Sequence, residues 1–310
     1  MNTHSDAMAA SPLDSQGIAP AVLSATRPFY WSIRRELWEN RSVYIAPLAV
    51  AAVFLFGFLI SMITLPQRLR TLSTLDPMQQ VQAVESPFAL VAGLLMVTQM
   101  LVGIFYSLDA LHGERRDRSI LFWKSMPVSD LTAVLSKAAI PIVVLPLFTF
   151  ALTVVTQLIM LLLGSLAVLG SGTKIAQLWN QLAWLQMSLG LLYHLVVVHG
   201  LWHAPLYGWL LLVSGWARRM VFVWAAIPPL AIAIIEKAAF NTSHFVDLVG
   251  YQLQGPGQYS FTVPYGSHMD PTMALGPLRL LAEPGLWTGL ALTALFLALT
   301  VRMRRYRGPI

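Results

Sequence analysis

The feature that most constrains this chain is a set of six apolar runs that can cross a bilayer as helices. They cover residues 43–65, 88–108, 138–168, 182–214, 220–240 and 285–301. A membrane helix needs about 20 residues, a length that the last two runs reach narrowly, and the apolar residues are continuous instead of alternating as in a membrane barrel. Only 11% of the residues are charged, against about 25% in soluble domains. We therefore predict an all-α integral membrane protein with six transmembrane helices.

The basic residues are unevenly divided between the two sets of connecting segments. With the N-terminus inside, fifteen Lys and Arg fall on the inner side and four on the outer side, while Lys237 lies in or near the fifth run. Short cytoplasmic loops carry an excess of Lys and Arg. The bias predicts that both termini are cytoplasmic and that the segment between the second and third runs is cytoplasmic too.

Two segments precede the first run. Residues 1–27 are rich in Ser, Ala and Pro and lack the apolar stretch of a signal peptide, so we expect a disordered cytoplasmic tail. Residues 28–41 place Phe29, Ile33 and Leu37 on one stripe of a helix, with polar residues opposite. This pattern predicts an N-terminal helix lying in the membrane interface. The alternative is a cytosolic extension of the first membrane helix.

The segment at 109–137 is charged, although apolar runs lie on both sides of it. Five charged residues stand in a row at 114–118, and a short apolar-faced segment follows at 120–123. Pro127 ends that segment, because proline lacks a donor and clashes with the preceding turn. Ser129 or Asp130 then caps the next helix. A short charged helix held there suits docking to a soluble partner; the alternative is a basic loop that contacts lipid head groups.

Two connectors are expected on the outer side. Residues 66–87 are polar, with a short helix at 78–84, and residues 241–284 hold many Gly, Pro and Tyr. Backbone polar groups cannot remain unsatisfied in lipid, so we expect 241–284 to form a compact extracytoplasmic cap that gates release or contacts an outer partner. Its aromatic residues available for packing are Tyr251, Tyr259, Phe261 and Tyr265.

Motifs for chemistry are scarce. No G-x-x-x-x-G-K-S/T sequence is present, so the chain is not expected to hydrolyse ATP through a phosphate-binding loop. There are no cysteines and hence no thiolate ligands. The pair Glu236-Lys237, inside the fifth run, reads as an interface anchor, with a functional charge pair as the alternative.

The histidines of the fourth run are the strongest candidates for an enzyme site. His199 and His203 are four residues apart and share a helix face, as the zinc ligands of H-E-x-x-H do. However, Gly200 stands where the glutamate base is needed, and at 100° per residue His194 lies about 140° from His199 and does not join the pair. We expect these histidines to bond to neighbouring helices or to line a polar cavity, with no metal and no catalytic residue.

The charged segment, the interfacial helix and the six runs together resemble the permease subunits of ABC-2 type ATP-binding cassette transporters. In that family the loop reads approximately E-R/K-x-x-G-T-L/I-x-x-L/W-x-x-x-P-V/I-S/T, followed by a Lys. The matching residues here are Glu114, Arg115, Ile120, Trp123, Pro127, Val128, Ser129 and Lys137. Arg118 replaces the usual Gly, and Ser119 the usual Thr. The resemblance covers about residues 28–307.

This resemblance implies a function and a set of partners. A second permease subunit, identical or different, pairs with the chain, and separate nucleotide-binding subunits hold ATP and Mg²⁺, so this chain is non-catalytic and needs no cofactor. The loop at 109–137 becomes a coupling loop, with Phe122 and Trp123 as apolar anchors. The residues assigned to docking are Glu114, Arg115, Arg116, Asp117, Arg118, Ser119, Phe122, Trp123 and Lys124. The expected location is a bacterial inner membrane, and nucleic acid is not among the expected partners.

The cargo is expected to be exported and to be apolar or amphipathic, because few charges lie within the runs. Two alternatives remain open. One is an ABC-like subunit that moves no substrate and transmits force to extracytoplasmic partners. The other is an intramembrane metalloprotease, against which the missing glutamate counts.

Overall fold

The computed structural model describes residues 26–64, 76–126, 128–168, 184–255 and 281–306, and these ranges are helical without a strand. The helices in chain order are α1 (Thr26–Glu39), α2 (Ser42–Ser61), the 3-10 turn η1 (Met62–Thr64), α4 (Pro77–Asp109), α5 (His112–Arg116), α6 (Ser119–Ser125), α7 (Asp130–Ala139), the π-helical turn η2 (Ile140–Val144), α8 (Leu145–Val168), α10 (Trp184–Tyr193), the π-helix η3 (His194–Trp202), α11 (Ala204–Trp216), α12 (Val221–Phe240), α13 (His244–Gln254) and α16 (Pro284–Tyr306).

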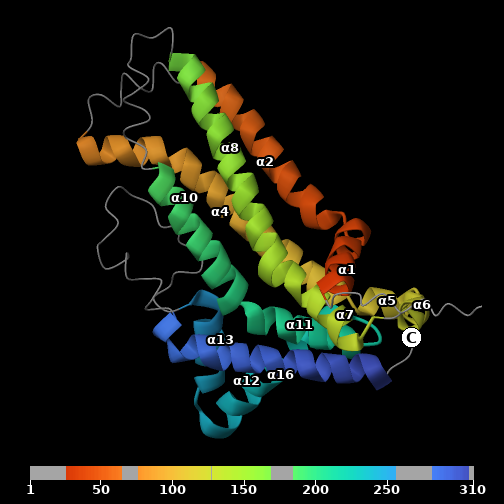
Figure 1. The fold of residues 1–310 in the computed structure, drawn as a ribbon. Coiled ribbons are helices and arrows are strands. Elements are labelled where there is room, and N and C mark those ends of the chain that lie inside the picture. Colours follow the sequence, from red (N-terminus) through yellow and green to blue (C-terminus); the bar gives the residue numbers. More distant parts are fainter. Residues whose placement is uncertain (1–25, 65–75, 127, 169–183, 256–280, 307–310) are drawn as a thin grey trace, which may run out of the picture.

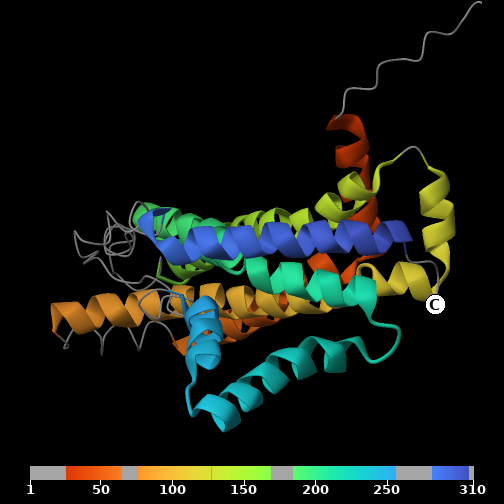
Figure 2. The ribbon, with the colours of Figure 1, turned by 90° about the horizontal axis from the view of Figure 1, so that it is seen from below.

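Within the described ranges, five helical stretches are long and apolar enough to cross a membrane. A sixth forms if the bent pair Met187–Trp202 and Ala204–Trp216, which changes direction by 44°, is one span. The all-α class is thereby confirmed, and five to six helical stretches have the length and composition of membrane spans. In Figure 1 the long helices α2, α4, α8 and α16 converge toward one end of the molecule, where α1, α5, α6 and the C-terminal end of α16 gather; Figure 2 shows the same end from below. We refer to this end as the α5–α6 end.

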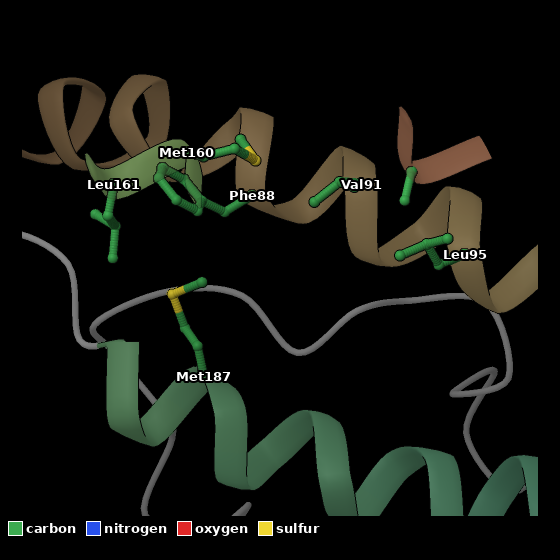
Figure 3. Close-up of a cluster of buried hydrophobic side chains, with 7 residues drawn as sticks. Phe88, Val91, Leu95, Met160, Leu161 and Met187 are labelled. Carbon is green, nitrogen blue, oxygen red and sulfur yellow. The ribbon is translucent and has the colours of Figure 1, made fainter. Parts of the chain in front are cut away.

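The core between α2, α4, α8 and α10 follows from helical spacing of apolar residues. Phe88, Val91 and Leu95 recur at intervals of three and four on α4, so they share one face, and each is at most 5% exposed. Met160 of α8 and Met187 of α10 pack against this face (Figure 3). The face starts at Phe88, where the second run was predicted to start, but the helix starts earlier, because α4 begins at Pro77 and continues through Pro87.

Prolines lie inside two of the long helical stretches without ending them. Pro141 lies in η2, where the backbone forms a π-helical turn, and the stretch from Asp130 to Leu166 continues as one span. Pro228 and Pro229 lie inside α12, which remains one helix. Freed carbonyls in membrane helices are commonly satisfied by such local adjustments.

The fourth span differs from expectation in its geometry. Its middle is the π-helix η3, with more residues per turn than an α-helix. Positions five apart therefore approach one another, and the rings of His194 and His199 lie 5.2 Å apart. The prediction that His194 does not join the histidine pair was wrong, because it assumed 100° per residue through a stretch where that rotation does not hold.

The fifth span, α12, contacts the bundle through its first residues, where Phe222 meets Phe105 of α4 and Trp209 of α11 donates to the Ala225 carbonyl. Figure 2 shows it diverging from α4 and α11, and among its residues only Val221 is buried. At its far end, Glu236 accepts hydrogen bonds from the backbone N–H groups of His244 (2.7 Å) and Phe245 (2.8 Å) at the start of α13. A carboxylate is favourable at a helix N-terminus, so Glu236 has a structural role in the turn between these helices.

Candidate partner-docking site at the α5–α6 end

A tight corner joins α5 to α6. Arg118 stands between the two helices with φ of 57°, the left-handed conformation that favours glycine. Ser119 begins α6, and its hydroxyl reaches the Glu114 carbonyl at 3.4 Å. After α6, Ser129 is the cap of α7, because its Oγ accepts from the Thr132 N–H at 3.0 Å. Of the two caps that the sequence allowed, Ser129 is the one used.

The helix α5 is fixed to the end of α11. Ser214 Oγ accepts from the backbone N–H of Leu111 (3.0 Å) and of His112 (2.9 Å), so it satisfies the first donors of α5 from outside. Arg115 Nη1 donates to the carbonyls of Gly215 (2.8 Å) and Ala217 (3.2 Å). A cation is favourable at a helix C-terminus. Arg115 therefore faces inward, where it holds the short helix in place.

Two buried carboxylates form the centre of an ionic cluster at this end. Glu36 of α1 and Glu114 of α5 are 1% and 7% exposed. Lys137 of α7, itself 2% exposed, donates to Glu36 at 2.8 Å and lies 3.1 Å from Glu114. Tyr106 of α4 donates its hydroxyl to the second oxygen of Glu36 at 2.9 Å. Lys137 thus joins α1 to α5.

Two arginines complete the cluster. Arg35 donates to Glu36 at 2.6 Å and to Glu114 at 2.8 Å. Burial lowers the pKa of the Arg35 guanidinium, but the neighbouring carboxylates, Glu36 first, outweigh it and the pKa is raised. Arg304 of α16 donates to Glu114 at 2.6 Å and to Asp130 at 3.1 Å. Glu114 therefore meets three cations from three helices.

Six side chains joined by contacts of 2.6–3.1 Å carry three negative and three positive charges, while exposed Glu39 lies 3.5 Å from Arg35 at the edge of this group. We define this group of six as the ionic cluster, and its members are Arg35, Glu36, Glu114, Asp130, Lys137 and Arg304. Breaking a buried pair on one side leaves an uncompensated charge, at a cost of about 3–5 kcal/mol. The arrangement holds α1, α5, α7 and α16 in fixed relative positions.

The face of this end that remains exposed is mixed in character. Phe122 and Leu121 of α6 are 59% and 58% exposed, and Met126 follows at 43%. Arg116 and Asp117 form an exposed ion pair at 2.9 Å, and its hydrogen bond lowers the pKa of the Asp117 carboxyl. We define the α6 surface as Arg116, Asp117, Arg118, Leu121, Phe122, Lys124, Ser125 and Met126, all exposed.

Trp123 points partly into the chain. Its ring lies under the Arg35 guanidinium at 3.8 Å and meets Phe122 edge-on at 4.9 Å. Beside it is a hollow of about 140 Å³ between α1, the connection from α6 to α7, and α16. Its lining includes Trp31, Arg35, Trp123, Met126 and Arg304. The indole is thus a half-buried wall of this hollow.

The residues expected at the docking site divide into two sets. Glu114 and Arg115 are buried within the chain, and Ser119 and Trp123 are half-buried, whereas the others are exposed on the α6 surface. Sequence reasoning missed the buried partners Glu36 and Arg304 and the half-buried Asp130. Glu36 could have been noticed, because it is a charged residue next to apolar positions on a helix. The sequence did not indicate which residues would pair with it.

The predicted apolar stripe of α1 was expected to face the membrane interface, but it packs elsewhere. Ile33 and Leu37 pack against the buried cluster that contains Val43 and Tyr106, and Phe29 is half-buried. The exposed aromatic residues of α1 are Tyr30, Trp31 and Trp38. Arg34 lies over the rings of Trp31 and Trp38, at 5.1 and 4.8 Å. Trp31, Arg34 and Trp38, and not the predicted stripe, therefore form the outward amphipathic face, a composition typical of membrane interfaces.

Four aromatic residues were predicted to pack within an extracytoplasmic gate. Among them, Tyr251 lies in the described part of the chain, on α13, whereas Tyr259, Phe261 and Tyr265 lie outside it. Among the described residues, no group of three His, Cys, Asp or Glu side chains is placed to hold a metal ion. Comparison with protein-family models and with curated proteins finds no match to this chain. A functional assignment therefore rests on the motif and on the geometry.

Proposed function

We propose that the chain is the membrane-spanning permease subunit of an ABC-2 type exporter in a bacterial inner membrane. In this proposal a separate ATPase subunit, which holds ATP and Mg²⁺, docks on the α6 surface from the cytoplasm. A second permease subunit pairs with the chain. The cargo is apolar or amphipathic and leaves the cytoplasm when ATP is hydrolysed.

The observation that carries the proposal is an exposed apolar residue on a short helix, α6, whose neighbour α5 is fixed by many contacts to the rest of the chain. Phe122 is 59% exposed on a seven-residue helix, while the adjoining α5 is fixed by Ser214, Arg115 and the ionic cluster. Lipid contact alone would not require such fixation, because a surface anchor works equally well on a flexible loop. Partner binding that transmits movement does require it.

The ionic cluster supports a route for that movement. A displacement of α6 would pass through the corner at Arg118 to α5, and from Glu114 to Lys137 and Arg304 on α7 and α16. These contacts are 2.6–3.1 Å long and buried, so they resist separation. The helices α7 and α16 lead into the third and sixth spans, which would then shift as units.

A photo-reactive residue at position 122 tests the docking site directly. It is introduced in cells that contain the native membrane, and irradiation is followed by identification of the attached protein. The proposal expects a soluble ATPase with a phosphate-binding loop. A matched probe at Leu48, an exposed residue of the α2 span (46%), should attach to lipid or membrane protein. Lipid alone at both positions would contradict the proposal.

Once the ATPase is isolated, alanine variants measure the contribution of the α6 surface. Phe122→Ala should weaken its binding by roughly 30-fold, because a buried aromatic anchor contributes about 2 kcal/mol. Lys124→Ala should change it much less, since rim charges mainly guide encounter. Vesicles that contain both subunits then decide between cargo export and force transmission without cargo. Equal effects of the two substitutions would remove Phe122 from the interface.

A further inference from the structure

A row of three buried histidines lies at the break in the fourth span. The rings of His194 and His199 are 5.2 Å apart, and those of His199 and His203 are 5.4 Å apart. Their exposed fractions are 5%, 1% and 1%. The row exists because η3 is a π-helix, and His203 is the residue where η3 ends and α11 begins. Ionisable groups within membrane spans are costly and commonly functional.

Both ring nitrogens of His203 face carbonyl oxygens. Nδ1 lies 2.8 Å from the Val198 oxygen, and Nε2 lies 3.1 Å from the Leu253 oxygen. A carbonyl oxygen only accepts, and a neutral imidazole has a single N–H. Neutral His203 therefore satisfies one contact and turns a lone pair toward the other carbonyl, whereas the imidazolium donates to both. The geometry around the ring is that of a site for the protonated form.

The surroundings allow one proton in the row. Two imidazolium rings about 5 Å apart in a poorly solvated interior would repel strongly. His199 Nδ1 is buried and has no hydrogen-bond partner among the described residues, so it offers a lone pair beside His203. On α4, Gln99 is fully buried with both amide atoms unpartnered within the described chain.

Within the described part of the chain, the hydrogen-bond partners of the His203 ring are two carbonyl oxygens, and no acidic side chain pairs with it. The helices packed against η3 offer little else that titrates: α8 and η2 carry no ionisable residue, and α4 carries Glu85 and Asp109 toward its two ends. Near the break, the titratable groups on adjoining elements are Tyr193 on α10, His194 and His199 on η3, Tyr207 on α11, Tyr251 on α13 and Glu283 before α16. The other titratable groups of α13 are His244 and Asp247 at its start, and those of α16 are Arg302, Arg304, Arg305 and Tyr306 at its C-terminal end. Of these, Glu283 bonds to Tyr251. The two carbonyl oxygens are thus the main stabilisation available to a proton on His203.

The Leu253 contact belongs to a set that attaches α13 to the break. Tyr251 meets the Trp202 ring edge-on at 5.3 Å, and Gln252 donates its amide to the Trp202 carbonyl. The Tyr251 ring also lies so close to Gly285 that a Cβ there would be 2.6 Å from it. Three consecutive residues of the last turn of α13 therefore contact the break or the start of α16.

We propose that His203 binds a proton and that this proton attaches α13 to the break in the fourth span. On deprotonation the one remaining N–H stays on the shorter contact, to Val198 in the same span, and the bond to Leu253 is lost. The end of α13 then loosens from the break. The site takes a proton as its ligand, and it does not depend on the proposed export function.

The absence of cysteine from the chain makes a spectroscopic test direct. A nitroxide label on Gln254→Cys reports the mobility of the last turn of α13, because Gln254 is exposed and makes none of the docking contacts. The purified full chain in detergent should give an immobilised signal near pH 5 and a mobile one as pH rises through the histidine range of about 5 to 8, along a one-proton curve. An unchanged signal over that range would overturn the proposal.

Substitutions identify the group that titrates. His203→Gln should abolish the transition, because an amide does not titrate there, while His112→Gln on α5 and His244→Gln at the other end of α13 should preserve it. Persistence of the transition in His203→Gln would refute the role of His203. Should that variant fail to fold, nitrogen-15 histidine spectra of the unsubstituted chain still decide: one solvent-protected ring with two protonated nitrogens is expected at acidic pH, and its absence is contrary.

Discussion

The α5–α6 end and the break in the fourth span both bury polar groups, but in opposite ways. At the α5–α6 end, six ionised side chains neutralise one another through contacts as short as 2.6 Å. At the break, imidazole rings and an amide meet backbone carbonyls, and several buried atoms have no partner among the described residues. Paired charges hold four helices rigidly, whereas a partly satisfied polar region is where a helix can change its contacts. The first suits transmission of force and the second suits a conformational change.

The largest loss of stability is expected when one carboxylate is removed from the ionic cluster, a change that tests whether the α5–α6 end is the rigid part of the molecule. Glu114→Gln leaves Arg35, Lys137 and Arg304 facing too few negative charges, so the free energy of unfolding should fall by about 3–5 kcal/mol. Denaturant unfolding of the purified chain measures this change in the free energy of unfolding. The control is Asp117→Asn on the exposed pair, for which the change should stay within about 0.5 kcal/mol. Similar small losses for both would mean that the cluster does not hold this end together.

A smaller effect is expected where the two π-helical segments cross. A Cβ at Gly200 of η3 would lie 2.6 Å from the Ile142 carbonyl oxygen of η2. Gly200→Ala should therefore destabilise the chain by about 1–3 kcal/mol, because a packed interior resists added volume. At Gly57 of α2 a Cβ would meet nothing within 4 Å, so Gly57→Ala should stabilise by up to about 1 kcal/mol. A neutral Gly200→Ala would show that the break adjusts freely.

The sequence predicted whatever depends on local spacing. The apolar runs predicted the all-helical class, and the residues after Pro127 limited the cap of α7 to Ser129 or Asp130, since both follow from neighbouring residues. The ionic cluster could not be predicted, because Lys137 meets a carboxylate 101 positions away and Arg304 meets one 190 positions away. The histidine row was missed for another reason: the π-helix changes the rotation per residue, and η3 has no proline or glycine pattern that sets it apart from an α-helix.

The smallest expected effect concerns the corner that connects the two parts of the charged segment. Arg118 holds φ of 57°, which costs a non-glycine residue roughly 1–2 kcal/mol, while glycine adopts it freely but loses about 0.5–1 kcal/mol more chain entropy on folding. Arg118→Gly should therefore stabilise the chain by about 0.5–1 kcal/mol, and it restores the glycine of the ABC-2 loop pattern.

Arg116→Gly is the matched control for the corner, because Arg116 lies in the last turn of α5 and is equally exposed. Glycine within a helix costs about 0.5–1 kcal/mol, so this variant should move the unfolding midpoint the other way. If both glycines destabilise, Arg118 is not held in the left-handed conformation in solution. The backbone at Arg118 would then be flexible, and a displacement of α6 would not be transmitted to Glu114.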